Sequence, residues 1–176
     1  MSESKKKKIF GLSNIVIFIA VGIFTLVYSY SQKGNYVAIS LGLSLSITSI
    51  AKNLYYGLKN NKDIYDIVAF YIAIIGIVIG TLFLCILSMN IELMCQIWGI
   101  YEIVNSIVEI VFHCQFIKSK RTTVIELLIS LAEIIFGILL CIHLKEGIHV
   151  HLIFLSITCF LNADVILLDD VLLVNN

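Results

Sequence analysis

Six long apolar runs limit the folds open to this chain more than any other feature. A helix that crosses the hydrocarbon core of a bilayer needs roughly 20 mostly apolar residues. The chain is 60% hydrophobic and 14% charged, and it has no proline to kink a helix. The runs lie at about residues 9–30, 36–57, 65–88, 92–116, 122–143 and 148–168. We therefore predict an all-α integral membrane protein with six transmembrane helices in one domain, residues 9–168.

The distribution of basic residues predicts the orientation. Cytoplasmic loops of membrane proteins are enriched in lysine and arginine. Most basic residues fall on one side of the predicted helices: Lys5, Lys6, Lys7, Lys8, Lys52, Lys59, Lys62, Lys118, Lys120 and Arg121. The other side has Lys33 and Lys145. The basic N-terminal segment 1–8 and the tail 169–176 are therefore both expected in the cytoplasm.

Small and hydrogen-bonding residues recur about every 57 residues. The columns are Gly22, Gly80 and Gly137 in the odd-numbered helices, Gly42, Gly99 and Ser156 in the even-numbered ones, and then Thr48, Asn105 and Asn162. A fixed period of this kind is the signature of repeated supersecondary units. The chain reads as three helical hairpins, at about 9–63, 64–121 and 122–170. Chance agreement within apolar sequence is the alternative.

The segments that carry these glycines resemble a known family. They read Gly22-Ile-Phe-Thr-Leu, Gly80-Thr-Leu-Phe-Leu and Gly137-Ile-Leu-Leu-Cys, and the next helix carries L-G-L, W-G-I or L-S-I. In these motifs the chain past Phe10 resembles the HdeD-like acid-resistance membrane proteins. The resemblance implies an inner-membrane location and a link to acid stress, without catalytic residues.

Two predicted helices carry a polar stripe with two carboxylates each. Residues spaced by 4, 3, 4 and 4 share one helical face. The stripe on 92–116 is Trp98, Glu102, Asn105, Glu109 and His113, and the stripe on 122–143 is Glu126, Ser130, Glu133, Gly137 and Cys141. An ionisable group at the centre of a membrane helix costs about 2.5–3.5 kcal/mol on insertion scales. Both stripes are therefore expected to face protein or water.

These acids have a structural and a functional interpretation. In the structural one they are paired packing elements, and Glu109, Glu126 and Asp164 reach the cytoplasmic interface near Lys52, Lys118 and Arg121. Lys52 lies 57 residues before Glu109, and we predict that the two pair. In the functional one, a polar path binds protons or cations, and it comprises Glu102, Asn105, Glu109, His113 and Glu133.

The remaining polar and small residues point to packing. His143, Glu146, His149 and His151 share the last loop, but they lack a recognised metal spacing, so solvated or pH-sensing histidines are expected, with no metal. The five cysteines form no CxxC pair and are expected to be packing residues. Small residues at Gly76 and Gly80, and at Ser40, Ser44 and Thr48, permit close helix approach, either within one bundle or in a homo-oligomer.

No sequence motif for catalysis is present. The chain has no phosphate-binding loop, nucleophile elbow, H-E-x-x-H or dinucleotide fingerprint. We therefore expect a non-enzymatic membrane protein without a cofactor, whose partner is the lipid bilayer and not nucleic acid. Its role is expected in acid or envelope stress. The alternatives are a small proton- or cation-coupled transporter or channel that uses the carboxylates, and a scaffold subunit of a membrane complex.

Overall fold

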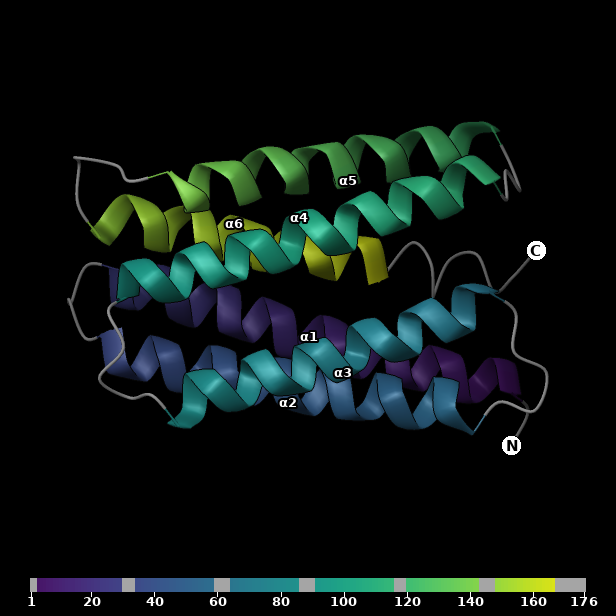
Figure 1. The fold of residues 1–176 in the computed structure, drawn as a ribbon, viewed down its shortest axis with the longest axis horizontal. Coiled ribbons are helices and arrows are strands. Elements are labelled where there is room, and N and C mark those ends of the chain that lie inside the picture. Colours follow the sequence, from purple (N-terminus) through teal and green to yellow (C-terminus); the bar gives the residue numbers. More distant parts are fainter. Residues whose placement is uncertain are drawn as a thin grey trace.

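A computed structural model describes residues 3–29, 34–58, 64–85, 91–115, 120–142 and 148–166. Within these ranges the chain forms six helices and no strand (Figure 1). The helices are α1 (Glu3–Ser29), α2 (Gly34–Gly57), α3 (Ile64–Cys85), α4 (Ile91–Gln115), α5 (Lys120–Cys141) and α6 (Ile148–Ile166). These bounds match the predicted runs closely, except that α1 begins earlier. Lysine is a good helix former, which explains why α1 includes the basic segment.

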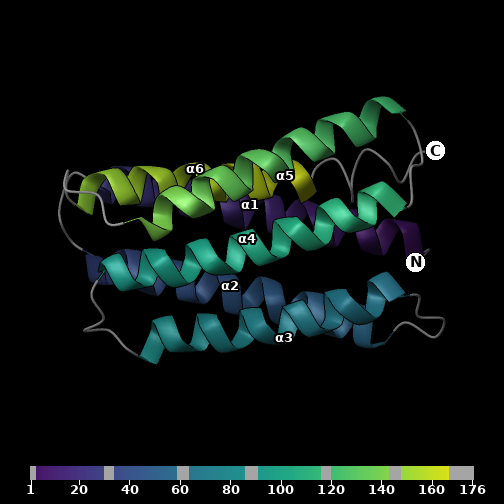
Figure 2. The same ribbon diagram turned by 45° about the horizontal axis from the view of Figure 1, so that its top comes forward.

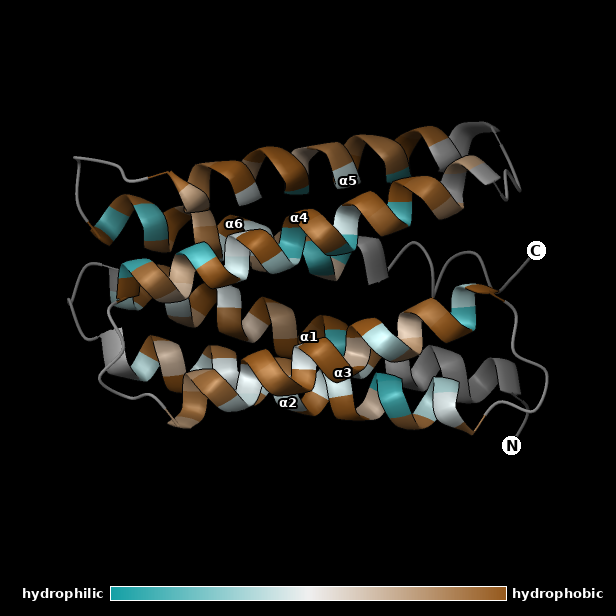
Figure 3. Cartoon of the chain, viewed as in Figure 1, coloured by the Kyte–Doolittle hydropathy of each residue, from teal (hydrophilic) through white to brown (hydrophobic). Residues whose placement is uncertain are grey.

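The outer faces of the bundle carry many large apolar side chains. Five helices, α1 to α5, are long and apolar enough to cross a membrane, and the apolar stretch of α6, Ile148–Asp164, is shorter. Aliphatic side chains cover the outer faces (Figure 3), as at Val16, which is 66% exposed, and Leu128, which is 62% exposed. Large exposed apolar patches are unusual on soluble monomers. Length, composition and surface are therefore consistent with a multi-pass membrane protein.

The helices run along one long axis and alternate in direction (Figures 1 and 2). The first residues of α1 and the last residues of α6 consequently lie at the same end of the bundle. The closest helix pairs are α2 with α3, α4 with α5, and α1 with α6. The pairs α1/α2, α3/α4 and α5/α6 pack less extensively, and α3 and α4 barely touch. The predicted hairpins are therefore not the closely packed units of the fold.

Facing glycines explain two of the close pairs. A Cβ atom added to Gly42 on α2 would lie 2.9 Å from the carbonyl oxygen of Gly80 on α3. A Cβ atom added to Gly99 on α4 would lie 2.6 Å from the carbonyl oxygen of Gly137 on α5. Any side chain at these positions would hold the two backbones apart. Glycine is what lets each pair of helices approach this closely.

The third close pair uses a hydrogen bond at the corresponding level. The hydroxyl of Ser156 on α6 donates to the carbonyl oxygen of Gly22 on α1 at 2.7 Å. Gly42, Gly99 and Ser156 are spaced by 57 residues, so the three even-numbered helices meet their partners through equivalent positions. Leu41, Trp98 and Leu155 precede them and are all buried in the core. Each even-numbered helix thus places a large apolar side chain in the core directly before its contact position.

The glycines of α3 face inwards as well. A Cβ atom on Gly76 would meet the Oγ atom of Ser49, and one on Gly80 would meet the Oγ atom of Ser46, both on α2. The small residues of this motif therefore pack within the bundle. All five cysteines lie in the part of the chain that the structure describes, and each is a free thiol.

Candidate functional site: a buried carboxylate cluster

The polar stripes of α4 and α5 turn towards each other inside the bundle. Glu102 on α4 and Glu133 on α5 are each only 1% exposed. Ser106, one turn after Glu102, joins them: its hydroxyl donates to Glu133 Oε2 at 2.8 Å and also lies 2.8 Å from the carbonyl oxygen of Glu102. Both acids therefore lie in the protein interior, away from the lipid-facing surface.

Two more helices contribute to this site. Asn162 on α6 donates from Nδ2 to Glu102 Oε1 at 3.0 Å and to the carbonyl oxygen of Thr158 at 3.0 Å. Lys52 on α2 acts electrostatically on both Glu102 and Glu133. Glu102 Oε2 is buried and has no hydrogen-bond partner among the described residues. Four helices thus surround one carboxyl group that has an unused acceptor. We call the set of Glu102, Glu133, Ser106, Asn162 and Lys52 the carboxylate cluster.

A second level of polar contacts extends the site along α4 and α5. Asn105 donates to Glu109 Oε1 at 2.9 Å, and the Ser130 hydroxyl donates to Glu109 Oε2 at 3.5 Å. Glu109 is half-buried, and Glu126 on the same face of α5 is buried. These polar contacts lead from the middle of α4 towards its C-terminal end. At this end of the bundle α1 begins and α6 ends (Figure 1). This is the end predicted to be cytoplasmic.

On the other side of Glu102 the buried face of α4 carries large apolar side chains. Met94, Cys95 and Trp98 on α4 are at most 1% exposed. The Trp98 indole donates to Thr158 Oγ1 at 3.1 Å, which ties α4 to α6. The carboxylates of the α4 stripe therefore end at Glu102, and the buried side chains of α4 beyond it are Trp98, Cys95 and Met94.

Not every predicted site residue joins the carboxylate cluster. Asp164 lies exposed on α6. His113 and Arg121 lie in α4 and α5, but their side chains are outside the described residues, as is all of Lys118. The pairing of Lys52 with Glu109 stays a prediction.

The histidines near the last loop form no ligand set in the described chain. His143 and Glu146 are outside the described residues, and His149 lies in the first turn of α6. His151 is buried, and its Nε2 atom lies 3.1 Å from the carbonyl oxygen of Ile142 at the end of α5. No group of three potential metal ligands occurs among the described side chains.

Sequence reasoning did not place Ser106 or Asn162 in the polar path. A signal for Ser106 was present, because it follows Glu102 by four residues and so lies one helical turn further on the same side. Asn162 stood out only as a recurrent residue, 57 positions after Asn105. Its contact with Glu102 joins helices far apart in sequence, which a single helical pattern does not reveal.

The combined geometry is that of an oxygen-rich site inside a bundle of apolar helices. Carboxylate, hydroxyl and amide oxygens bind protons or hard cations. Comparison with known protein families, with curated proteins and with solved structures finds no match for this chain. A functional proposal therefore has to come from the site itself.

Proposed function

We propose that this chain is a six-span membrane protein, with both termini in the cytoplasm, whose carboxylate cluster takes up and releases a proton or a small cation within the bilayer. Glu102 is the binding group, and Glu133 and Lys52 alter the electrostatic potential at its carboxyl group. Asn162 and Ser106 are positioning residues, because they hold the two carboxyl groups in place. The plasma membrane is the proposed location.

The observation that carries this proposal is the unequal environment of the two Glu102 oxygens. Oε1 accepts from Asn162, while Oε2 is buried without a partner in the described chain. Leaving a buried acceptor unsatisfied costs about 1–3 kcal/mol, and more for a charged group. Ionisable groups in membrane helices are expensive and mark ion or proton pathways. An ion bound at Oε2 would offset that cost.

The one-sided polar stripe favours gated binding over an open pore. From the level of Glu102 towards the proposed cytoplasmic end, Asn105 and Ser130 both donate to Glu109. Beyond Glu102, the buried side chains of α4 are Trp98, Cys95 and Met94, none of which carries a charge. A permanent channel would need a polar lining through both halves of the membrane. A site reached from one side at a time fits a sensor or a coupled transporter.

Reconstituted protein provides the test. We expect proteoliposomes that enclose a pH-sensitive dye to show pH-driven proton movement with the natural chain, and to lose it with the double variant Glu102→Gln/Glu133→Gln. Asp164→Asn is the matched control, since Asp164 is an exposed acid outside the cluster. A response in sodium or potassium gradients alone would identify a cation as the ligand. Equal responses from the natural chain and the double variant, in both proton and cation gradients, would refute the proposal.

A stress role of the HdeD-like kind, with three repeated hairpins, is the second proposal. The equivalent contacts of Gly42, Gly99 and Ser156 support the repeats, because segments derived from one ancestor are expected to keep small residues at one level. The acid-stress part predicts that cells dependent on this protein survive acid less well when they carry Glu102→Gln. Reporter tags fused to the two ends should both be found in the cytoplasm; opposite locations would contradict the six-span topology.

A further inference from the structure

Three helix pairs are loosely packed: α1/α2, α3/α4 and α5/α6. They differ in how far side chains fill the space between the two helices. Between α5 and α6 the rings of Phe136 and Phe154 meet, with centroids 5.8 Å apart. The residues 57 positions earlier, on α3 and α4, are Ile79 and Ile97. These side chains are smaller, and α3 and α4 barely touch. Where α5 and α6 have an aromatic pair, α3 and α4 have a gap.

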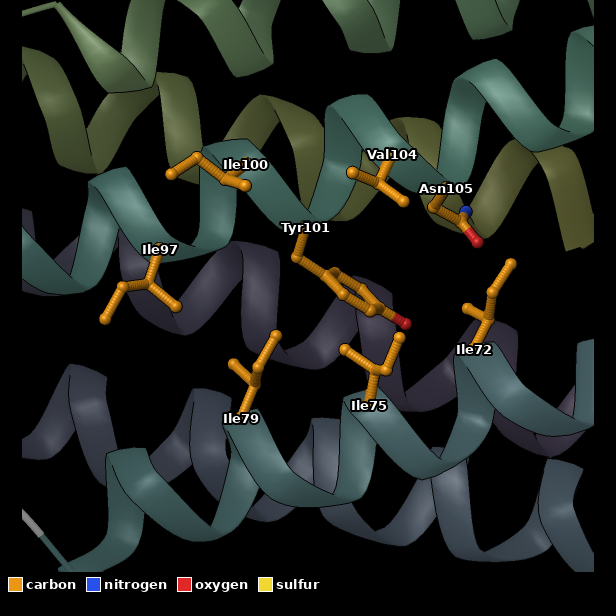
Figure 4. A pocket seen from close by; sticks show the side chains of 8 residues that line it. All are labelled: Ile72, Ile75, Ile79, Ile97, Ile100, Tyr101, Val104 and Asn105. Atoms are coloured by element: carbon orange, nitrogen blue, oxygen red, sulfur yellow. The ribbon is translucent and has the colours of Figure 1, made fainter.

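That gap is a cavity of about 210 Å³. Figure 4 shows its lining: Ile72, Ile75 and Ile79 from α3 face Ile97, Ile100 and Val104 from α4, with Tyr101 and Asn105 along the inner wall. No charged side chain lines it. Ile75, Ile100 and Val104 are also 49%, 57% and 48% exposed, so the cavity opens towards the outer surface of the bundle. We call it the α3/α4 groove.

We propose that the α3/α4 groove binds one acyl chain of a bilayer lipid. The groove lies over the middle of both helices, where the surrounding bilayer consists of hydrocarbon chains and not headgroups. Along α4 it extends from residue 97 to residue 105, about 12 Å at 1.5 Å per residue. Acyl chains are therefore the molecules present at the opening, and their shape matches a narrow apolar slot.

Size and chemistry argue against other occupants. Apolar cavities of about 150 Å³ stay dry yet bind small hydrocarbons, so this larger one favours a hydrocarbon over water. A helix from a second copy has a diameter of about 10 Å with its side chains and would not enter a slot of this volume. A polar ligand would find only Tyr101 and Asn105 as partners, and Asn105 already donates to Glu109.

The chain itself indicates how to close the groove. The double variant Ile79→Phe/Ile97→Phe places the aromatic pair of α5 and α6 at the positions 57 residues earlier, which line the groove. Ile74→Phe/Ile107→Phe is the matched control. It adds the same two rings to the same two helices, at lipid-facing positions that do not line the groove.

The single tryptophan of the chain reports occupancy. The Trp98 ring lies beside the groove residue Tyr101, with centroids 6.3 Å apart, while Trp98 itself is only 1% exposed. In bilayers of phosphatidylcholine with brominated acyl chains, we expect Trp98 fluorescence to be quenched in the natural chain. Most of this quenching should be lost in Ile79→Phe/Ile97→Phe and kept in Ile74→Phe/Ile107→Phe.

Two outcomes would overturn the proposal. One is equal quenching in the groove-closing variant and the natural chain. The other is loss of quenching together with conversion of a dimer to a monomer, which would make a second copy the occupant. If the double phenylalanine variant does not fold, Val104→Leu supplies the test. It copies Leu161 of α6, 57 residues later, and should reduce quenching in the same direction. Quenching does not depend on ion movement. The proposal for the groove can therefore fail without affecting the proposal for the carboxylate cluster.

Discussion

The α2/α3 and α4/α5 pairs have the same backbone contact but different interiors. In each, two glycines face each other and let the helices approach closely. Further along, α2 and α3 meet through Ser49 and Gly76, whereas α4 and α5 meet through Ser106 and Glu133, at positions 57 residues later. In α2/α3 this second contact is again made by small residues. The other pair holds a buried carboxyl group at the level where its counterpart has a glycine.

The even-numbered helices show the same contrast. Leu45 on α2, Glu102 on α4 and Cys159 on α6 are spaced by 57 residues and are all buried. At this level α2 and α6 contribute an apolar side chain, and α4 contributes the carboxyl group of the proposed binding site. The small residues therefore set how closely the helices pack, and the residues one or two turns away set the chemistry of the interior.

The largest expected effect comes from breaking a shared glycine contact. An alanine Cβ at position 80 would lie 2.8 Å from the backbone nitrogen of Ser46 and 2.9 Å from the carbonyl oxygen of Gly42. We expect Gly80→Ala to lower the free energy of unfolding in detergent by about 2 kcal/mol, since overpacking costs of this order are usual. Gly57→Ala is the control: the atom nearest to the added Cβ belongs to the Phe70 ring, 3.3 Å away. The free energy of unfolding of this variant should be close to that of the natural chain. Equal stability of the two variants would mean that the glycine contact does not limit packing.

Glu102→Leu makes α4 resemble α2 at the level of the carboxylate cluster. Replacing buried ionic groups by well-packed hydrophobic residues is often neutral or stabilising. We expect the free energy of unfolding to rise by about 1 kcal/mol while proton or cation movement in liposomes is lost. The leucine at position 45, which is 2% exposed, shows that this side chain is accommodated at the equivalent level of α2. A clear loss of stability would show that Glu102 holds the bundle together instead of serving as a binding group.

Ser156→Ala should have the smallest effect, because it removes only the hydroxyl that distinguishes the α1/α6 pair. Its bond to the Gly22 carbonyl oxygen joins two helices. Interhelical hydrogen bonds in membranes contribute about 0.6 kcal/mol on average, so a loss of that size in the free energy of unfolding is expected. Thr81→Ala is the control, since the Thr81 hydroxyl bonds within its own helix, to Ile77. If Ser156→Ala lowers the free energy of unfolding no more than the control does, the hydroxyl does not help to hold α1 to α6.

Much of the site was predictable because it follows helical periodicity. The stripes with Glu102 and Glu133 were recognised from 4 and 3 residue spacings, and the structure places both acids in the interior. Ser106 was missed although it lies one turn from Glu102, because serine in an apolar helix is also an ordinary packing residue. Asn162 was missed as a ligand, because its contact with Glu102 depends on how α6 lies against α4.

The extent of the helices, their suitability for a bilayer and the levels of the small and acidic residues all follow from the amino-acid sequence, because composition and helical spacing are local properties. The choice of partners does not. The predicted hairpins join α1 to α2, α3 to α4 and α5 to α6, whereas the most extensive contacts join α2 to α3, α4 to α5 and α6 to α1. That pairing, the gap between α3 and α4, and the isolation of one Glu102 oxygen arise from which faces meet when all six helices pack at once.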